Sequence, residues 1–220
     1  MTKPGAQPDA VGFVLAGGQS SRMGREKALL PWQGRTLVEN ALAILREAGL
    51  PAAIAGARAS GLAAFAPVVP DAEPGLGPLA GLCAALASAP AHWAVFLPVD
   101  VPLLPAALLL YMLHHARITQ RPITLASVAG YAQTFPAVVA RAALPTLRQA
   151  LHSGNGGCFA AFRAAAAAAG QPLTVLPAEV LAQSGHGSHP AGLPPVRWFL
   201  NVNTPDDLRL AAMQRAAHLA

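Results

Sequence analysis

The sequence predicts a single α/β domain in which helices cover both faces of a mostly parallel, twisted sheet. Three observations support this fold class. The chain has 220 residues, 54% of them apolar, which is enough to bury one full core. Short apolar runs of strand length alternate with longer runs of helical periodicity. The first apolar run, 11–16, ends at two glycines, as is typical of a strand buried on both faces of a parallel sheet. Such alternation favours right-handed crossovers between parallel strands.

The expected elements follow in this alternating order. After the first strand, a helix is predicted at 36–48, because Leu37 and Ala41 begin an apolar stripe at helical spacing and Thr36 can cap its first turn. The other strands are expected at 52–55, 67–69, 93–97, 122–128, 134–140, 173–176 and 198–203. The other helices are expected at 77–88, 105–116, 142–151, 157–168 and from Pro205 onward.

The sequence predicts one domain after a short tail, with no segment that spans a membrane. Residues 1–10 predict a short disordered tail, and 11–220 predict one domain. Within that domain, 183–195 lack periodicity and are predicted to form a mobile loop. No basic and apolar leader opens the chain, and its longest apolar stretches, such as 101–113, fall short of the roughly 20 residues of a membrane span. We therefore expect a cytoplasmic protein that does not associate with membranes.

The charge distribution and the number of cysteines argue against a nucleic-acid-binding protein, a disulfide-rich protein and a zinc protein. The net charge is +5, but only 11% of residues are charged and the arginines are scattered singly, so we expect no nucleic-acid partner. Cys83 and Cys158 are too few for a disulfide framework or a zinc site and are expected to be buried thiols. The seven histidines show no metal-ligand spacing, and the loop serines have no partner order typical of a hydrolase triad.

The segment after the first strand predicts a phosphate-binding turn. It carries glycines and hydroxyls, followed by Arg22 and Lys27. Lysine is rare here: the chain has only Lys3 and Lys27 against 13 arginines, so the compact ammonium of Lys27 is expected to reach between phosphate oxygens. The spacing matches neither a Walker loop nor the dinucleotide fingerprint. A plain connection between strand and helix remains the alternative. The turn residues in question are Gly17, Gly18, Ser20 and Ser21.

Two carboxylates lack a structural explanation in the sequence. Asp9 falls in the predicted tail, and Asp206 and Asp207 suit a helix start, which leaves Asp71 and Asp100. Both follow predicted strands, and side chains at the carboxyl ends of parallel strands face the ligand crevice. Asp100 is therefore expected to hold Mg²⁺ that bridges phosphates. A turn or a cap is the alternative for each aspartate.

Two further patterns are compatible with ligand binding. The glycines of 75–81, Gly77 among them, could let backbone approach a base or ribose, although a loop before a helix explains them equally well. Asn201 and Asn203 alternate on the predicted strand at 198–203 and would share one face. If that face lines the crevice, their amides would hold a second substrate; otherwise they are polar groups of an edge strand.

Taken together, these motifs resemble the molybdenum cofactor guanylyltransferase family (MobA type), whose nucleotidyltransferase fold has a Rossmann-like sheet. The matching blocks occur in the family's order. Ala16-Gly17-Gly18 stands where related cytidylyltransferases usually have Ala-Ala-Gly, which favours guanine over cytosine. The blocks are 15–24, 27–30, 77–81, 98–102 and 199–205.

The resemblance implies a guanylyltransferase that joins GMP from GTP to molybdopterin, the organic part of the molybdenum cofactor, and releases pyrophosphate. Arg22, Lys27 and Asp100 would be its catalytic residues, with Mg²⁺ on Asp100, and Asn201 and Asn203 would bind the acceptor. The residues expected at GTP are Leu15, Ala16, Gly17, Gly18, Ser20, Lys27, Asp71, Gly77 and Asp100.

The chain departs from the family pattern on the side expected to receive the acceptor. Phe135 replaces the family's histidine, and Gly156-Gly157 replaces a basic pair. Two alternatives therefore remain open. The chain could transfer a nucleotide to another phosphorylated acceptor, or it could be a non-catalytic nucleotide-binding adaptor that serves molybdoenzyme assembly proteins.

Overall fold

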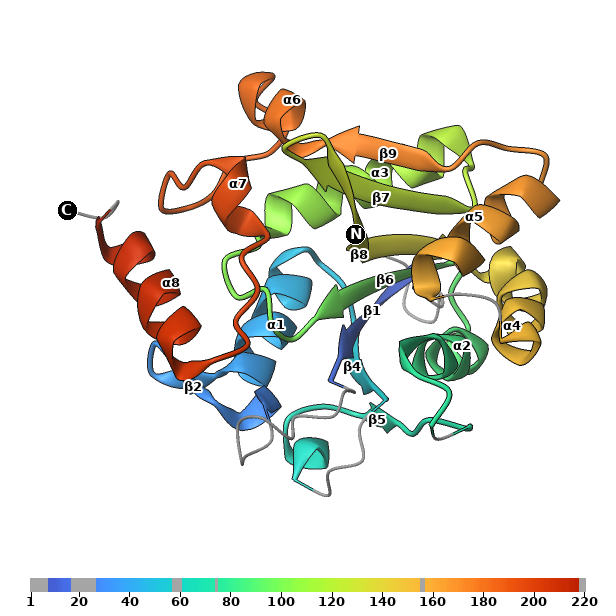
Figure 1. The fold of residues 1–220 in the computed structure, drawn as a ribbon, viewed down its shortest axis with the longest axis horizontal. Coiled ribbons are helices and arrows are strands. Elements are labelled where there is room, and N and C mark those ends of the chain that lie inside the picture. The colour runs from blue at the N-terminus through green and yellow to red at the C-terminus, as the bar shows by residue number, and fades with distance from the viewer. Residues whose placement is uncertain (1–7, 17–26, 57–60, 74, 155–156, 218–220) are drawn as a thin grey trace.

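The computed structural model describes residues 8–16, 27–56, 61–73, 75–154 and 157–217. Their central feature is a seven-stranded sheet of order β5-β4-β1-β6-β8-β7-β9, with helices packed on both faces (Figure 1). Only β8 runs antiparallel to its neighbours β6 and β7. The predicted fold class is confirmed. In sheet order the strands are β5 (Val68–Val69), β4 (Ala52–Ala55), β1 (Ala10–Leu15), β6 (Trp93–Pro98), β8 (Tyr131–Ala140), β7 (Ile123–Val128) and β9 (Thr174–Pro177).

The central strand β6 shows why the sheet is covered on both sides. Side chains alternate between the two faces of a strand, so an all-apolar strand needs apolar partners on each. Trp93, Val95 and Leu97 join one buried cluster with α1 (Leu37–Glu47) and α3 (Ala106–Thr119). Ala94 and Phe96 join a second cluster on the other face. That cluster contains α2 (Pro78–Ser88), α4 (Leu144–Ser153) and α5 (Cys158–Ala168).

The shorter elements complete the description. A small hairpin, β2 (Pro31–Trp32) with β3 (Arg35–Thr36), precedes α1. The described residues from 178 onward add three helices (Figure 1), and each contributes side chains to the first buried cluster. They are α6 (Ala178–Gln183), α7 (Pro195–Trp198) and α8 (Pro205–Ala217), and the 3₁₀ turns are η1 (Lys27–Leu29), η2 (Leu62–Ala64) and η3 (Arg141–Ala143).

The start of α1 confirms the predicted cap. Thr36 Oγ1 accepts a hydrogen bond from the backbone N–H of Glu39 (3.4 Å), and the N–H of Thr36 donates to Glu39 Oε2 (2.7 Å). This reciprocal capping box satisfies two backbone donors that the helix itself leaves unpaired. The hydrogen bonds from Thr36 lower the pKa of the Glu39 carboxyl group. The cap fixes the end of the hairpin that follows Lys27.

One expectation about the last third of the chain is wrong. No strand forms at 198–203: Trp198 ends α7, and its indole N–H donates to the carbonyl of Leu193 (2.7 Å). The N–H of Val202 donates to the carbonyl of Asp100 (2.9 Å) instead of to a neighbouring strand. The segment 183–195 begins in α6 and ends at the first residue of α7, and Ala191 and Leu193 in it are buried. Its second half therefore packs against the core, and its mobility stays a prediction.

Gly81 is explained by close packing against Gly56. A Cβ atom at this position of α2 would lie 3.2 Å from the Cα atom of Gly56, directly after β4. We expect Gly81→Ala to lower the free energy of unfolding by about 1–3 kcal/mol, because neighbouring backbone must move to admit the methyl group. Urea denaturation measures this loss. Gly61→Ala is the matched control, since among the described residues its Cβ would meet only Leu29 Cδ1, at 3.9 Å. Equal losses in the two variants would contradict the packing argument.

Within the described residues, no helix combines the length and the apolar character that crossing a bilayer requires. The two cysteines are buried free thiols, as expected. Burial raises the pKa of both Cys83 and Cys158 to about 11. Both therefore stay protonated near neutral pH, and neither is suited to act as a nucleophile.

Candidate functional site

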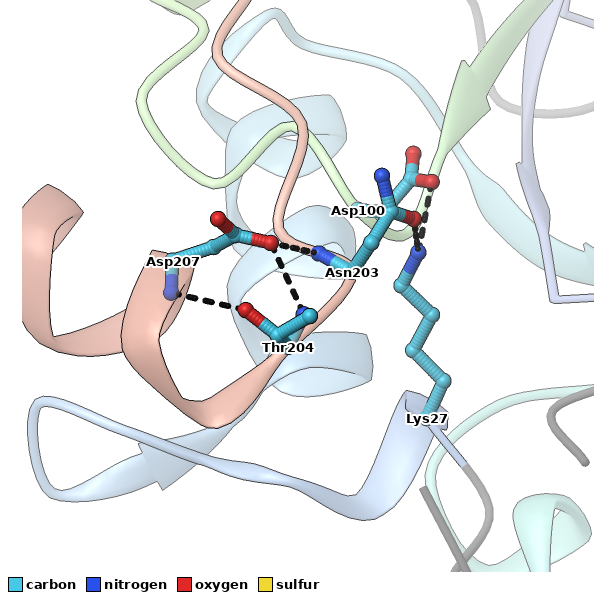
Figure 2. Close-up of polar contacts among 5 residues, drawn as sticks. All are labelled: Lys27, Asp100, Asn203, Thr204 and Asp207. Atoms are coloured by element: carbon cyan, nitrogen blue, oxygen red, sulfur yellow. Dashed lines mark hydrogen bonds and ion pairs between the residues drawn. The ribbon is translucent and has the colours of Figure 1, made fainter. Parts of the chain in front are cut away.

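A lysine, an aspartate and an asparagine from three distant parts of the chain meet at one edge of the sheet (Figure 2). Lys27 Nζ donates to Asp100 Oδ2 at 2.8 Å and to Asn203 Oδ1 at 2.6 Å. Lys27 begins η1, Asp100 follows β6, and Asn203 precedes α8. We call these three residues the lysine cluster. The structure thus brings together three predicted site residues: Lys27, predicted to bind phosphate, Asp100, predicted to hold the metal, and Asn203, predicted to bind the acceptor.

The topology of the sheet places Asp100. Strand β6 is parallel to β1, with Pro98 paired to Leu15, and the N–H of Val99 donates to the carbonyl of Leu15 (3.2 Å). Asp100, the next residue after Val99, therefore lies at the carboxyl edge of the sheet, beside the end of β1. Ligands of open parallel sheets bind at this edge. The predicted position of Asp100 relative to the first strand is confirmed.

A buried asparagine that sequence reasoning missed ties the Asp100 loop to α1. Asn40 is only 2% exposed. Its Nδ2 donates to the carbonyl of Pro102 (3.0 Å), and its Oδ1 accepts from Arg35 Nη2 (2.6 Å). A buried amide is tolerated only when it is hydrogen-bonded. The signal was present in the sequence, because Asn40 interrupts the apolar stripe of its helix.

Asn203 reaches the cluster through backbone contacts rather than through a strand. The Val202 N–H bond to the carbonyl of Asp100 holds the segment against the loop that carries the carboxylate. Asp207 Oδ2 then accepts hydrogen bonds from the N–H groups of Asn203 (2.9 Å) and Thr204 (2.8 Å). The bond from Asn203 is the largest contribution that lowers the pKa of the Asp207 carboxyl group, followed by hydrogen bonding to Thr204. Because no strand forms here, the argument that Asn201 and Asn203 share a face fails, and Asn201 is simply exposed.

The other predicted residues lie outside the lysine cluster or outside the described residues. Asp71 Oδ1 accepts a hydrogen bond from the N–H of Glu73 (3.1 Å), so the turn alternative is observed. Asp71 follows β5 at the same carboxyl edge of the sheet as Asp100. In the sheet, β4 lies between β5 and β1. Gly77 caps α2 with φ 78°, a backbone conformation that favours glycine. Ligand-binding roles for Asp71 and Gly77 stay predictions. The predicted residues outside the described ranges are Gly17, Gly18, Ser20 and Arg22.

The electrostatics of the lysine cluster suit an exchange of partners. The side chains of Lys27 and Asp100 are 18% and 25% exposed, so both remain accessible to water. Accessible ion pairs contribute only roughly 0–1 kcal/mol to stability. Lys27 can therefore exchange Asp100 for phosphate oxygens as its partner, and Asp100 can exchange Lys27 for a cation. Neither exchange would cost the fold much stability. Within the described ranges, no three or more His, Cys, Asp or Glu side chains gather as a metal site.

A separate pocket of about 420 Å³ lies on the face of the sheet that α2, α4 and α5 cover. Leu76 and Pro78 line it at the start of α2, Phe135 lines it from β8, and Gly154 and Cys158 line it between α4 and α5. These residues give the pocket a mostly apolar wall. The pocket thus combines a predicted nucleotide-binding block with Phe135, where the chain departs from the family pattern.

An open α/β sheet with a lysine and a carboxylate at its carboxyl edge is an arrangement typical of nucleotide-binding proteins. The comparison with known families agrees with this class. The chain belongs to the MobA-like NTP transferase domain family, whose model matches residues 12–169. The segment that carries Asn203 and Asp207 lies beyond the matched region.

Individual relatives have more specific names than the family, but they match a shorter part of the chain. A molybdenum cofactor guanylyltransferase from Xanthomonas euvesicatoria is 52% identical over 99 residues, which are 44% of this chain and 50% of that protein. The chain spans about half the length of the curated relatives it matches.

Two solved structures share the fold over almost the whole chain. Molybdopterin-guanine dinucleotide biosynthesis protein A from Archaeoglobus fulgidus has a TM-score of 0.72 and 22% identity, and the match covers 94% of this chain and 98% of that one. A Mycobacterium tuberculosis protein solved as a complex with manganese has a TM-score of 0.60 and 22% identity, over 94% and 99% of the two chains. At such identities these matches show the fold alone.

Proposed function

We propose that the chain transfers the GMP moiety of GTP to molybdopterin and releases pyrophosphate. The observation that carries the proposal is the contact of Lys27 with Asp100 beside the end of β1, because it joins an ammonium group and a carboxylate at the edge where nucleotides bind. Family membership supports nucleotidyl transfer. The name of the 52% identical relative supports guanylyl transfer in particular.

The nucleotide is proposed to lie along the end of β1. Lys27 would leave Asp100 and donate to the triphosphate, together with Arg22 and the backbone N–H groups of the glycine turn. Leu15 and Ala16 would contact the nucleoside at the strand end, and Asp71 and Gly77 would complete this side of the site. The residues proposed from the glycine turn are Gly17, Gly18 and Ser20.

Asp100 is proposed to hold Mg²⁺. Its carboxylate fits, because Mg²⁺ prefers oxygen ligands and usually takes only one or two from protein carboxylates, with substrate phosphates and water supplying the rest. The bound ion would neutralise charge on the triphosphate and on the departing pyrophosphate. The manganese complex of the mycobacterial structural neighbour supports the use of a divalent cation.

The reaction needs no covalent intermediate on the protein. An oxygen of the acceptor's terminal phosphate attacks the α-phosphorus of GTP in line, and the bond from that phosphorus to the pyrophosphate oxygen breaks. Lys27 and Arg22 hold the triphosphate for this attack and offset its charge. Asn203, which contacts Lys27, is proposed to orient the acceptor phosphate beside it, and Asn201 to bind the acceptor further out.

A second candidate is transfer to another phosphorylated acceptor. The apolar wall of the pocket favours it, because Phe135 offers no charge to a pterin phosphate where the family has histidine. A third possibility, a nucleotide-binding adaptor for molybdoenzyme assembly proteins, would keep the lysine cluster but not the turnover.

Pyrophosphate release by the purified protein separates these candidates. With GTP, Mg²⁺ and molybdopterin we expect release, and the product should have the mass of molybdopterin guanine dinucleotide. Release only with a different phosphorylated acceptor would overturn the molybdopterin assignment in favour of the second candidate. GTP binding without release with any acceptor would contradict the enzyme and support the adaptor.

A further inference from the structure

We propose that Asp207 is a positioning residue that holds Asn203, and through it Lys27, in place for the transfer reaction. The inference rests on the proposed function of the lysine cluster. It adds a residue from a part of the chain beyond the family match, which ends at residue 169.

The geometry forms a short chain of contacts (Figure 2). Asp207 Oδ2 accepts from the N–H of Asn203 at 2.9 Å. The side chain of that residue then meets Lys27 Nζ at 2.6 Å. Lys27 Nζ in turn contacts Asp100 at 2.8 Å. Asn203 and Lys27 thus connect the carboxylate of Asp207, at the start of α8, with the carboxylate of Asp100, which is proposed to hold the metal.

Part of this arrangement is an ordinary helix cap. Thr204 is the residue before α8, its Oγ1 accepts from the N–H of Asp207 (3.1 Å), and Asp207 accepts in return from the N–H of Thr204 (2.8 Å). A capping box needs only these two bonds. The bond from the N–H of Asn203 is additional and lies outside the helix. It fixes the backbone of the residue whose side chain enters the site.

The segment is held at a second point as well. The N–H of Val202 donates to the carbonyl of Asp100 at 2.9 Å, and Val202 is fully buried. With Asp207 on one side and Asp100 on the other, the backbone of Asn203 has little freedom. Its side-chain oxygen can therefore hold the Lys27 ammonium group on the side where the triphosphate is proposed to bind.

Asp206 provides a matched control within the same helical turn. Its carboxylate pairs with Arg209 Nη2 at 2.6 Å, and both side chains are strongly exposed, at 84% and 75%. Asp206 and Asp207 both carry negative charge at the positive end of the α8 helix. Among the described residues, only Asp207 also accepts hydrogen bonds from the N–H groups of Asn203 and Thr204. A role of Asp207 as a mere helix cap would affect α8 but not Lys27.

The first experiment measures pyrophosphate release by Asp207→Ala, Asp207→Asn and Asp206→Ala. We expect Asp207→Ala to reduce kcat roughly tenfold, because misplacement of a group that orients the reactants slows the reaction. Asp207→Asn should recover part of this loss, since its amide oxygen still accepts the two N–H bonds. Asp206→Ala should stay within about twofold of the original protein. Equal effects of Asp206→Ala and Asp207→Ala would overturn the proposal.

A double-mutant cycle tests whether Asp207 acts through Asn203. If it does, Asp207→Ala should cause almost no further loss in a chain that already carries Asn203→Ala, because the two residues form one unit. Independent losses that multiply in the double variant would contradict the proposal. An effect of Asp207→Ala that reached the site through α8 and not through Asn203 would give such independent losses.

A second measurement does not depend on the reaction. The chain has only two lysines, so ¹⁵N-lysine labelling gives two ammonium signals in an NMR spectrum, and one of them is Lys27. We expect Asp207→Ala to shift the Lys27 signal and Asp206→Ala to leave it unchanged. If the original protein releases no pyrophosphate but the Lys27 signal responds in this way, the proposed function fails and the positioning role of Asp207 stands. If the protein is active and the signal does not respond, the positioning role fails alone.

Discussion

Asp100→Ala is expected to lower the rate of pyrophosphate release by about a thousandfold or more, because it removes the proposed ligand of the divalent cation. The fold should persist. The main-chain carbonyl of Asp100, which accepts from Val202, is kept in the variant, and Lys27 retains Asn203 as a partner. Steady-state release of pyrophosphate and thermal unfolding of the same preparation measure the two quantities together.

Asp9→Ala is a suitable control for this variant. Asp9 also forms an aspartate ion pair, with Arg117 Nε at 2.9 Å, but on an exposed part of the surface. Its loss should leave the rate unchanged. The account would be contradicted if Asp100→Ala retained most of its activity at saturating Mg²⁺, since the carboxylate could then not be the main site of the cation.

Lys27→Ala should reduce the same rate by roughly a hundredfold to a thousandfold, as is typical for removal of a group that stabilises charge in the transition state. Lys27→Arg should restore little of it. The flat guanidinium group is larger than an ammonium group and needs a different arrangement of partners. It would have to fit between Asp100 and Asn203, which approach the Lys27 Nζ atom to 2.8 and 2.6 Å.

The other lysine is the natural control for this pair of variants. Lys3→Ala lies in the predicted tail and should leave turnover unchanged. Full activity of Lys27→Arg would mean that any cation suffices, and the argument from the rarity of lysine would then fail. Full activity of Lys27→Ala would remove Lys27 from the mechanism altogether.

The parts of the fold that could be predicted from the sequence are those whose signals are local. The α1 helix carries its own cap at Thr36 and its own apolar stripe, and its observed bounds, Leu37–Glu47, differ from the prediction by one residue at each end. The β6 strand is an apolar run of the right length, and its parallel pairing with β1 follows from the alternation of elements. The position of Asp100 at the carboxyl edge could therefore be predicted as well.

The segment before α8 could not be predicted in this way. The alternation of Leu200, Val202 and their polar neighbours suits a strand, but the N–H of Val202 bonds to the carbonyl of Asp100, about a hundred residues earlier. Only the three-dimensional structure shows this partner. The same holds for Asn40, whose amide bonds to Pro102. Contacts between distant residues decide these details, and local sequence patterns do not encode them.

The most direct test of the central claim is calorimetric titration of GTP, ATP, CTP and UTP with Mg²⁺ into the original protein, Lys27→Ala and Asp100→Ala. The claim is that Lys27 and Asp100 together hold the triphosphate of a guanine nucleotide. It predicts that GTP binds most tightly to the original protein and that both variants lose most of this affinity. Unchanged binding of GTP to both variants, or a preference for CTP in the original protein, would contradict it.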